Sequence, residues 1–419
     1  MLLFNKKVST IIWYILLISI LAFPRILQSL KIVLCILLIV SGIIENRGLR
    51  IKRHVGMFFL IWVAYSAVTI ISGLIHGNLE EGIYAFIRVN IFNTILYIMI
   101  ISVLRGEEVY KATIKAVIYS TLYISIYNIV FIGAGYVGLS VPFLERMDAT
   151  ARVGFHIGYT HIVTTNLSMS IMLFPLIAML VNDNDIKKIV NNKVHILAVI
   201  LCGAAMVLSG RRILWISLAI GLIGLYFYNT KNIKEKFRYL VIAIVVIVFG
   251  IYIANRTGLI SLDGLVTRFR YAFTSTDEYG LANVREIQAK YMMEAFVNHP
   301  VFGNGAGAVL SGIQRSETSP WAYELSYHVV LFQSGTVGAL FFFSALALIV
   351  RNIMRTTRIS RPVGMSLLIA FISILIANAT NPYFSSSFDF MIFIFLPFSL
   401  TEFIIGYKDS NQFTVRQEL

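Results

Sequence analysis

The sequence predicts an all-α, polytopic membrane protein, and two observations lead to this class. Of its 419 residues, 58% are hydrophobic and only 13% are charged, whereas a soluble globular domain is roughly half apolar and about a quarter charged. A chain this apolar cannot bury its hydrophobic surface in one aqueous core, so lipid must be its solvent. The second observation is a series of apolar runs, most of them long enough for a helix that crosses a bilayer.

We expect about twelve membrane-spanning helices. A helix needs about 20 mostly apolar residues to cross the hydrocarbon, and fewer where protein covers part of it. Only Ser209-Gly210-Arg211-Arg212 separates the seventh run from the eighth, and two arginines at a bilayer centre are costly, so this tetrapeptide is expected at a surface hairpin. The twelve runs are residues 8–24, 30–46, 55–74, 83–104, 112–134, 160–181, 194–209, 211–229, 238–254, 323–350, 363–378 and 387–406.

The distribution of lysine and arginine predicts the orientation of these helices. With a cytoplasmic N-terminus, the cytoplasmic segments hold 22 of the 35 basic residues, and the short outer loops hold only six. An even number of spans then places the C-terminus in the cytoplasm as well. The same asymmetry accounts for the net charge of +14 without any nucleic acid partner.

The predicted spans divide the chain into three segments. Residues 1–254 hold spans one to nine, and residues 323–419 hold spans ten to twelve with a short cytoplasmic tail. Residues 255–322 are the one long polar interruption, and because they follow the ninth span we expect them outside the cytoplasm. Within this loop, the apolar spacing from Ile287 onward predicts an amphipathic helix that Pro300 would end.

The sequence contains no motif that predicts a nucleotide, a metal or a disulfide. The stretch Gly303-Asn304-Gly305-Ala306-Gly307 is rich in glycine, but it has no preceding strand and no Lys-Ser/Thr, both of which a P-loop requires. A tight turn is the favoured interpretation. Cys35 and Cys202 lie in apolar runs, and no Cys/His cluster has ligand spacing. We therefore expect no metal, no cofactor and no disulfide framework.

Several arginines lie on the predicted outer side. Arg211 and Arg212 occupy the expected hairpin tip, on the face that is normally poor in basic residues; the alternative is that they only reach toward the membrane surface. Arg285 lies in the first turn of the amphipathic helix, where a positive charge opposes the helix dipole. A bound anion would supply the missing negative charge, and pairing with Glu286 or Glu294 is the alternative.

Further candidates lie on the fourth and tenth predicted spans. Arg88 falls inside a span, so a functional role is the default hypothesis, unless its side chain reaches outer water from a short first turn. Glu324 and His328 are four residues apart with Tyr327 between them, a spacing that would put carboxylate and imidazole on one helix face. The acid would orient the imidazole and raise its basicity. An inert histidine near the membrane surface is the alternative.

This set of groups favours one kind of chemistry. Several arginines in a partly dry site suit the bidentate binding of a diphosphate. The neighbouring lipid and the absence of a nucleotide motif point to a lipid-linked diphosphate. With a hydroxyl acceptor, the natural reaction is a group transfer in which the diphosphate leaves.

Between residues 195 and 350 the chain resembles the O-antigen ligase and polymerase superfamily. The string Leu208-Ser209-Gly210-Arg211-Arg212 is similar to the Ser-x-Arg hairpin of that family. Arg285, followed by the stretch HPVFGNGAG at residues 299–307, resembles its outer loop. Residues 324–328 and 333–338 (ELSYH and QSGTVG) resemble its return helix. The order and spacing of these motifs also resemble the family.

The resemblance implies sugar transfer from undecaprenyl diphosphate, without a metal, on a helical fold of the GT-C kind in the bacterial cytoplasmic membrane. By position, Arg211 and Arg285 would hold the donor diphosphate, and His328 would lie near the acceptor hydroxyl. The Glu-x-x-Tyr pattern from Glu324 to Tyr327, and Val329 after His328, resemble the Wzy-type polymerases more than the ligases.

The favoured hypothesis is a metal-independent glycosyltransferase that polymerises undecaprenyl-diphosphate-linked repeat units of O-antigen or a similar surface polysaccharide. Its expected partners are the lipid-linked oligosaccharide, membrane lipid and a chain-length regulator. The catalytic candidates are His328, Arg211, Arg285 and Glu324. The candidates for binding diphosphate or glycan are Arg88, Arg211, Arg212, Arg285 and Tyr327.

Three alternatives remain open at this point. A ligase would move finished glycan onto lipid A-core or a protein. A transporter or flippase would carry a polysaccharide or a lipid-linked sugar, although the inverted repeats common in transporters are missing. A receptor or assembly scaffold is the third class, but no cytoplasmic segment is long enough for a signalling module.

Overall fold

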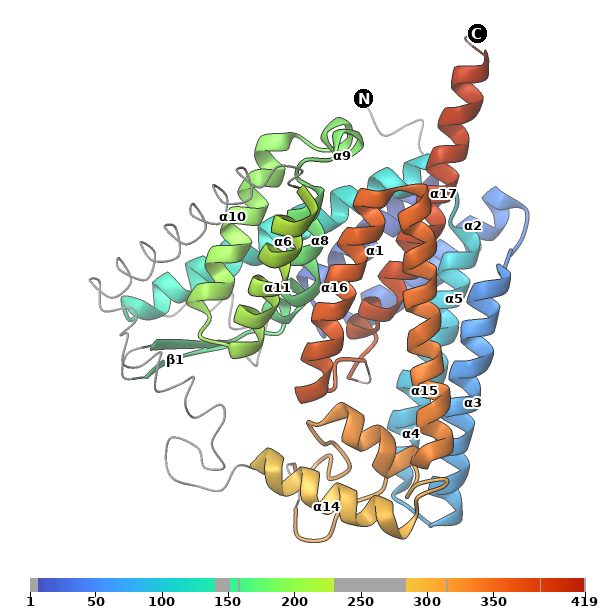
Figure 1. Ribbon diagram of the computed structural model, residues 1–419, viewed down its shortest axis with the longest axis vertical. Helices are drawn as coiled ribbons and strands as arrows, with labels where there is room; N and C mark the ends of the chain where they lie inside the picture. Colours follow the sequence, from blue (N-terminus) through green and yellow to red (C-terminus); the bar gives the residue numbers. More distant parts are fainter. Residues whose placement is uncertain are drawn as a thin grey trace.

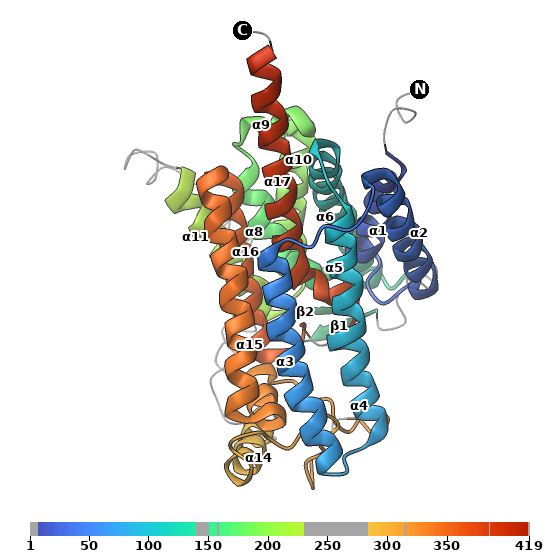
Figure 2. The same cartoon turned by 90° about the vertical axis from the view of Figure 1, so that its right-hand side faces the viewer.

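The computed structural model describes residues 7–139, 151–156, 159–229, 284–313, 316–384 and 386–417. Within these ranges the protein is a bundle of helices with one short β-hairpin at its side (Figure 1). Helix α1 begins and helix α17 ends at one end of the bundle, and α14 lies at the opposite end (Figures 1 and 2).

The helices and strands follow one another along the chain with mostly short connections. In order they are α1 (Val8–Ala22), α2 (Gln28–Asn46), α3 (Arg53–Ile75), α4 (Glu80–Ile87), the π-helical η1 (Arg88–Phe92), α5 (Asn93–Val103), α6 (Glu107–Tyr136), β1 (Arg152–His156), β2 (Tyr159–Val163), the 3₁₀-helix η2 (Asn166–Met169), α8 (Ser170–Leu180), α9 (Asn184–Ile189), α10 (Asn192–Leu208), α11 (Arg212–Asn229), α14 (Val284–Asn298), α15 (Ser326–Ile359), α16 (Arg361–Thr380), the 3₁₀-helix η3 (Asp389–Met391) and α17 (Ile392–Gln417).

The predicted class of all-α polytopic membrane protein is supported by helix length and composition. In the described part of the chain, six helices are long and apolar enough to cross a membrane: 28–46, 53–75, 80–103, 107–135, 326–359 and 361–380. Four shorter apolar helices lie at 8–22, 166–180, 192–208 and 212–228. All ten coincide with predicted runs, and α17 covers most of the twelfth. The predicted ninth span, residues 238–254, lies outside the described residues.

The prediction for the sixth run was wrong at its start. A helix was expected from residue 160, but Tyr159–Val163 forms strand β2, which pairs antiparallel with β1 so that Arg152 lies opposite Val163. β-Branched residues such as Ile162 and Val163 favour extended backbone, and a partner strand satisfies their peptide groups. The helical segment begins only at Asn166.

Helix α8 forms the centre of the bundle. Every residue of Ser170–Leu180 is buried, as expected for a helix that is apolar on all sides. It packs against α16, α11 and α10. By contrast, α2 exposes Ile32, Ile36, Leu37 and Val40 along one face. In a membrane protein such an uncovered apolar face lies against lipid.

A smaller core holds α14 to the rest of the protein. It contains Met292 of α14, Leu310, Tyr323 and Phe332 of α15. The Leu310 N–H donates a hydrogen bond to the Tyr323 hydroxyl at 2.6 Å. Burial raises the pKa of Tyr323, so its phenol stays uncharged at neutral pH. We call the described part of the predicted loop, residues 284–313 and 316–322, the outer segment. Its residues Met292 and Leu310 pack against Tyr323 and Phe332, which belong to the tenth predicted span.

A buried ion pair joins the first turn of α2 to η3, the short helix that precedes α17. Lys31 Nζ lies 2.5 Å from Asp389 Oδ1, and their side chains are only 1% and 0% exposed. Gln28 Nε2 donates to Asp389 Oδ2 at 2.7 Å, and the Arg25 N–H donates to the same oxygen at 2.8 Å. Lys31 Nζ also donates to the Phe23 carbonyl at 2.7 Å. Asp389 thus accepts hydrogen bonds from three residues, of which Arg25 precedes α2 and Gln28 and Lys31 lie in its first turn.

We expect Lys31→Met to lower the free energy of unfolding by about 3–5 kcal/mol, because it leaves the Asp389 carboxylate buried without its counter-charge. Thermal denaturation of the purified protein in detergent measures this. Lys111→Met is the matched control, since Lys111 forms a partly exposed pair with Glu107 one helical turn away, and such pairs contribute about 0.5 kcal/mol. Equal melting temperatures for the two variants would contradict the assignment.

Candidate functional site

Arg211 lies in the tight turn that joins α10 to α11. Gly210 has φ +65°, a left-handed conformation that glycine adopts without steric cost. The Arg211 guanidinium donates to Ser168 Oγ at 3.1 Å and reaches the Tyr383 hydroxyl at 3.5 Å. Both partners are neutral, and no carboxylate of the described residues contacts Arg211. Its positive charge is therefore oriented by hydroxyl groups but not neutralised by them.

Three segments that are far apart in sequence meet at this guanidinium. Ser168 belongs to η2, and Tyr383 follows α16. The Tyr383 ring packs against Phe390 and Phe393, with ring centroids 5.6 Å and 5.8 Å away, so the position of its hydroxyl is set by aromatic packing. The sequence analysis missed Ser168 and Tyr383. The available signal was weak: each lies in a short polar stretch at the predicted outer end of a span.

Arg285 and Glu324 form an ion pair between α14 and the segment before α15. Arg285 Nε donates to Glu324 Oε2 at 2.5 Å, and the two side chains are 39% and 13% exposed. The Glu324 N–H donates to Gln288 Oε1, also on α14, at 3.3 Å. Glu324 therefore supplies a negative charge beside this first-turn arginine, where the sequence had suggested a bound anion. The expected alternatives, Glu286 and Glu294, do not appear as partners in the described contacts.

The expected helical face shared by Glu324 and His328 is absent. Helix α15 begins at Ser326, so Glu324 precedes it and turns to Arg285 instead. His328 is half-buried in the first turn of α15, and the described residues provide no hydrogen bond to its ring. The Tyr327 hydroxyl donates to the Leu375 carbonyl of α16 at 2.7 Å. This hydrogen bond of Tyr327 therefore joins α15 to α16.

Arg88 and Arg212 occupy different surroundings. Arg88 is exposed and opens the π-helical turn η1, a type of turn that is often found at functional sites. That turn is stabilised by Trp62 Nε1, which donates to the Asn90 carbonyl at 3.0 Å. Arg212 is the first residue of α11 and is partly buried. Among the described contacts, none joins Arg88 to Arg211 or Arg285.

The two arginine sites lie on the same side of the bundle. The turn between α10 and α11 points toward the end where α14 lies, away from the end of α17 (Figure 1). Figure 2 likewise places α14 below the lower end of α15 and level with the lower end of α3. The expectation that Arg211 and Arg285 face one side is consistent with this arrangement. No described contact joins the two side chains directly.

The glycine-rich stretch 303–307, which we call the glycine clasp, is a structural element of this end. The backbone N–H groups of its three central residues each donate a 2.8 Å hydrogen bond to another element, namely to the carbonyls of Phe332, Gln333 and Thr69. Amides that are used in this way are not free to cradle a phosphate. The interpretation of this stretch as a turn, not a P-loop, agrees with these contacts.

The clasp inserts where α15 is interrupted. Gly335 has φ +61° inside the helix, and the next two N–H groups donate to the carbonyls of Pro300 and Val301 at 2.8 Å and 3.1 Å. On its other side the clasp touches α3 at Gly73, where an added Cβ would meet the Ala306 carbonyl oxygen at 2.5 Å. Close approach of two backbones explains glycine at these positions.

Taken together, the described residues form a helical bundle of the polytopic membrane class, with Arg211 and Arg285 toward the end where α14 lies. Residues 197–343 match the family model described as O-antigen ligase. No curated protein matches the chain. The matched region runs from α10 to α15 and contains Arg211, Arg285, Glu324 and the glycine clasp.

This match confirms the resemblance to the O-antigen ligase and polymerase superfamily. It supports a glycan-handling enzyme of the ligase or polymerase type that acts in polysaccharide biosynthesis. It also supports a multi-pass protein of the bacterial inner membrane, with lipid-linked glycan and membrane lipid as its partners. A transporter or a receptor is not favoured by the match.

We expect Gly305→Ala to prevent stable folding of the outer segment, because a Cβ there would collide with the backbone of Ser72 and Gly73. Gly312→Ala is a close control: Gly312 has φ +86°, against +85° for Gly305, and nothing lies within 4 Å of its added Cβ. It should cost only about 1–2 kcal/mol of backbone strain. The rate of limited proteolysis between α14 and α15 measures the difference. Equal resistance of the two variants to the protease would contradict the close packing of Gly305 against α3.

Proposed function

We propose that the protein polymerises undecaprenyl-diphosphate-linked oligosaccharide repeat units on the outer face of the cytoplasmic membrane, with both termini in the cytoplasm. The observation that carries this proposal is the environment of Arg211. Its guanidinium is oriented by two neutral hydroxyl groups, and an oriented cation without a carboxylate partner is suited to bind an anionic substrate. The family match over residues 197–343 supports a glycan substrate.

In the proposed reaction, the acceptor hydroxyl oxygen forms a bond to the anomeric carbon of the donor sugar. The bond from that carbon to the diphosphate oxygen breaks, and its electron pair leaves with the diphosphate. His328 accepts the hydroxyl proton as general base. Arg211 stabilises the negative charge that develops on the leaving group, which is commonly the largest contribution to such catalysis.

Arg285 and Glu324 would act together in this scheme. While no donor is bound, the carboxylate of Glu324 neutralises Arg285 and holds α14 against the start of α15. A diphosphate carries more negative charge than a carboxylate and also accepts bidentate hydrogen bonds from arginine. The donor would therefore replace Glu324 as the partner of Arg285, and Arg88, Arg212 and Tyr327 would contribute at the edge of the site.

Arg211→Ala and Arg285→Ala should each reduce chain elongation by about a hundred-fold or more, as expected for loss of a group that stabilises the leaving charge. Polysaccharide length analysis in a deletion strain that carries each variant measures this. Arg355→Ala is the control, because Arg355 is exposed on the far half of α15. Long polymer from both site variants, at wild-type protein levels in the membrane, would remove the proposed site.

A ligase is the second candidate, because the matching family is described by that activity. The two reactions leave different products when the gene is deleted. A polymerase deletion should leave single repeat units attached at the cell surface. A ligase deletion should leave lipid-linked polymer that never reaches its acceptor. Surface glycan from the deletion strain, separated by size, therefore decides between them, and we expect single repeat units.

A further inference from the structure

We propose that Arg25, in the connection between α1 and α2, is a second arginine of the Arg211 site and binds the diphosphate of the lipid-linked donor. This proposal rests on the proposed function, because it assigns a further binding residue to the same reaction. Its chemistry is recognition of phosphate groups by two guanidinium groups from different segments of the chain. The family match begins at residue 197, so it does not include Arg25.

The backbone of Arg25 is held in an unfavourable conformation. Arg25 has φ +63° and Leu27 has φ +57°, and side chains other than glycine, asparagine and aspartate rarely adopt this left-handed region. The hydrogen bond from the Arg25 N–H to Asp389 Oδ2 fixes the backbone in place. Strained residues persist where the surrounding structure imposes them, and they cluster at functional sites.

The Arg25 guanidinium is not needed to neutralise Asp389. That carboxylate already receives the charge of Lys31 at 2.5 Å and a hydrogen bond from Gln28 at 2.7 Å. The Arg25 side chain is exposed and lies over the ring of Phe390, with its Cζ atom 5.6 Å from the ring centroid. In the described part of the chain, no carboxylate contacts the Arg25 side chain. Its charge is therefore available to a ligand.

A short series of contacts connects Arg25 to Arg211. Arg25 lies over Phe390, the Phe390 and Tyr383 rings are 5.6 Å apart, and the Tyr383 hydroxyl is 3.5 Å from Arg211 Nη2. Arg25 thus contacts one ring of the Phe390–Tyr383 pair, and Arg211 contacts the other residue of that pair. Two like charges in a partly dry region repel each other, and an anion with two phosphate groups would convert that repulsion into attraction to both.

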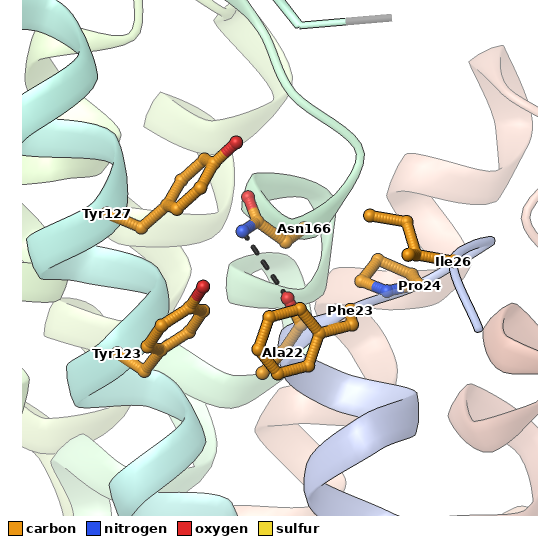
Figure 3. A pocket seen from close by; sticks show the side chains of 7 residues that line it. All are labelled: Ala22, Phe23, Pro24, Ile26, Tyr123, Tyr127 and Asn166. Carbon is orange, nitrogen blue, oxygen red and sulfur yellow. Dashed lines mark hydrogen bonds between the residues drawn. The ribbon is translucent and has the colours of Figure 1, made fainter. Parts of the chain in front are cut away.

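A small pocket is lined by the two residues that flank Arg25 in the chain. Pro24 and Ile26, the neighbours of Arg25, line it together with Asn166, which is two residues before Ser168 (Figure 3). Its cavity volume is about 10 Å³, which is room for a single water molecule. Figure 3 shows that the hydroxyl groups of Tyr123 and Tyr127 are directed toward the side where Asn166 lies.

Arg25→Gly tests the proposal without disturbing the backbone, because glycine favours the conformation that Arg25 is forced to adopt. Leu27→Gly is the matched control, since it relieves the same kind of strain in the same connection and keeps the guanidinium. We expect Arg25→Gly to fold at least as well as wild type and to lose chain elongation by about ten-fold or more, as for loss of a charged hydrogen bond. Leu27→Gly should elongate normally.

Binding to the purified full-length protein identifies the source of the phosphate. Arg25→Gly should weaken binding of undecaprenyl diphosphate by about ten-fold or more, while binding of phosphatidylglycerol stays as in wild type. Equal loss of both ligands would mean that Arg25 holds lipid headgroups, and wild-type binding of undecaprenyl diphosphate would overturn the proposal directly. If Arg211→Ala elongates normally, the proposed function fails; if only Arg25→Gly does, this inference alone fails.

Discussion

The buried carboxylate of Asp389 is the constraint on which much of this structure depends. A fully buried charge is tolerated only when it is paired and its remaining oxygen positions receive hydrogen bonds. Here the pairing comes from Lys31, and the other donors are Gln28 and the Arg25 N–H. Because Arg25 lies just before α2 and Gln28 and Lys31 lie in its first turn, these contacts hold η3, which precedes α17, against the start of α2. Phe390, the residue after Asp389, is positioned by the same constraint.

A second constraint acts at the end that carries α14. There the chain leaves regular helix, and its peptide groups need partners that a helix would have supplied. The glycine clasp solves this by exchanging hydrogen bonds with α3 and with the interruption of α15 at Gly335. Only glycine allows the backbones to approach so closely, so the outer segment is joined to two long helices through main-chain contacts.

These two constraints place arginines in contrasting electrostatic states. Among the described residues, Arg211 has the hydroxyl groups of Ser168 and Tyr383 as its partners, whereas Arg285 is paired with Glu324. In the proposed reaction, the first guanidinium is ready for a diphosphate and the second becomes available when its carboxylate partner is displaced. The pair of Arg285 and Glu324 also connects α14 to the segment before α15. Binding of the donor would therefore change the position of the outer segment.

The sequence by itself determined the features that depend on local composition. Apolar runs predicted lipid as the solvent and the position of most helices. They could do so because each membrane-spanning helix needs its own run of about 20 mostly apolar residues. The cost of charge in the bilayer located the turn at Arg211, and the missing P-loop residues identified the glycine-rich stretch as a turn. Local pattern failed at residues 160–163, where pairing with β1 makes the chain a strand.

Only the tertiary structure decided the partners of the charged groups. Glu324 was expected to serve His328 four residues later, but the start of α15 at Ser326 leaves it facing Arg285. The pairing of Lys31 with Asp389, and the approach of Tyr383 to Arg211, join residues that are more than a hundred positions apart. No periodicity encodes such pairs, because they arise from the way whole helices pack, and packing is a property of the assembled bundle.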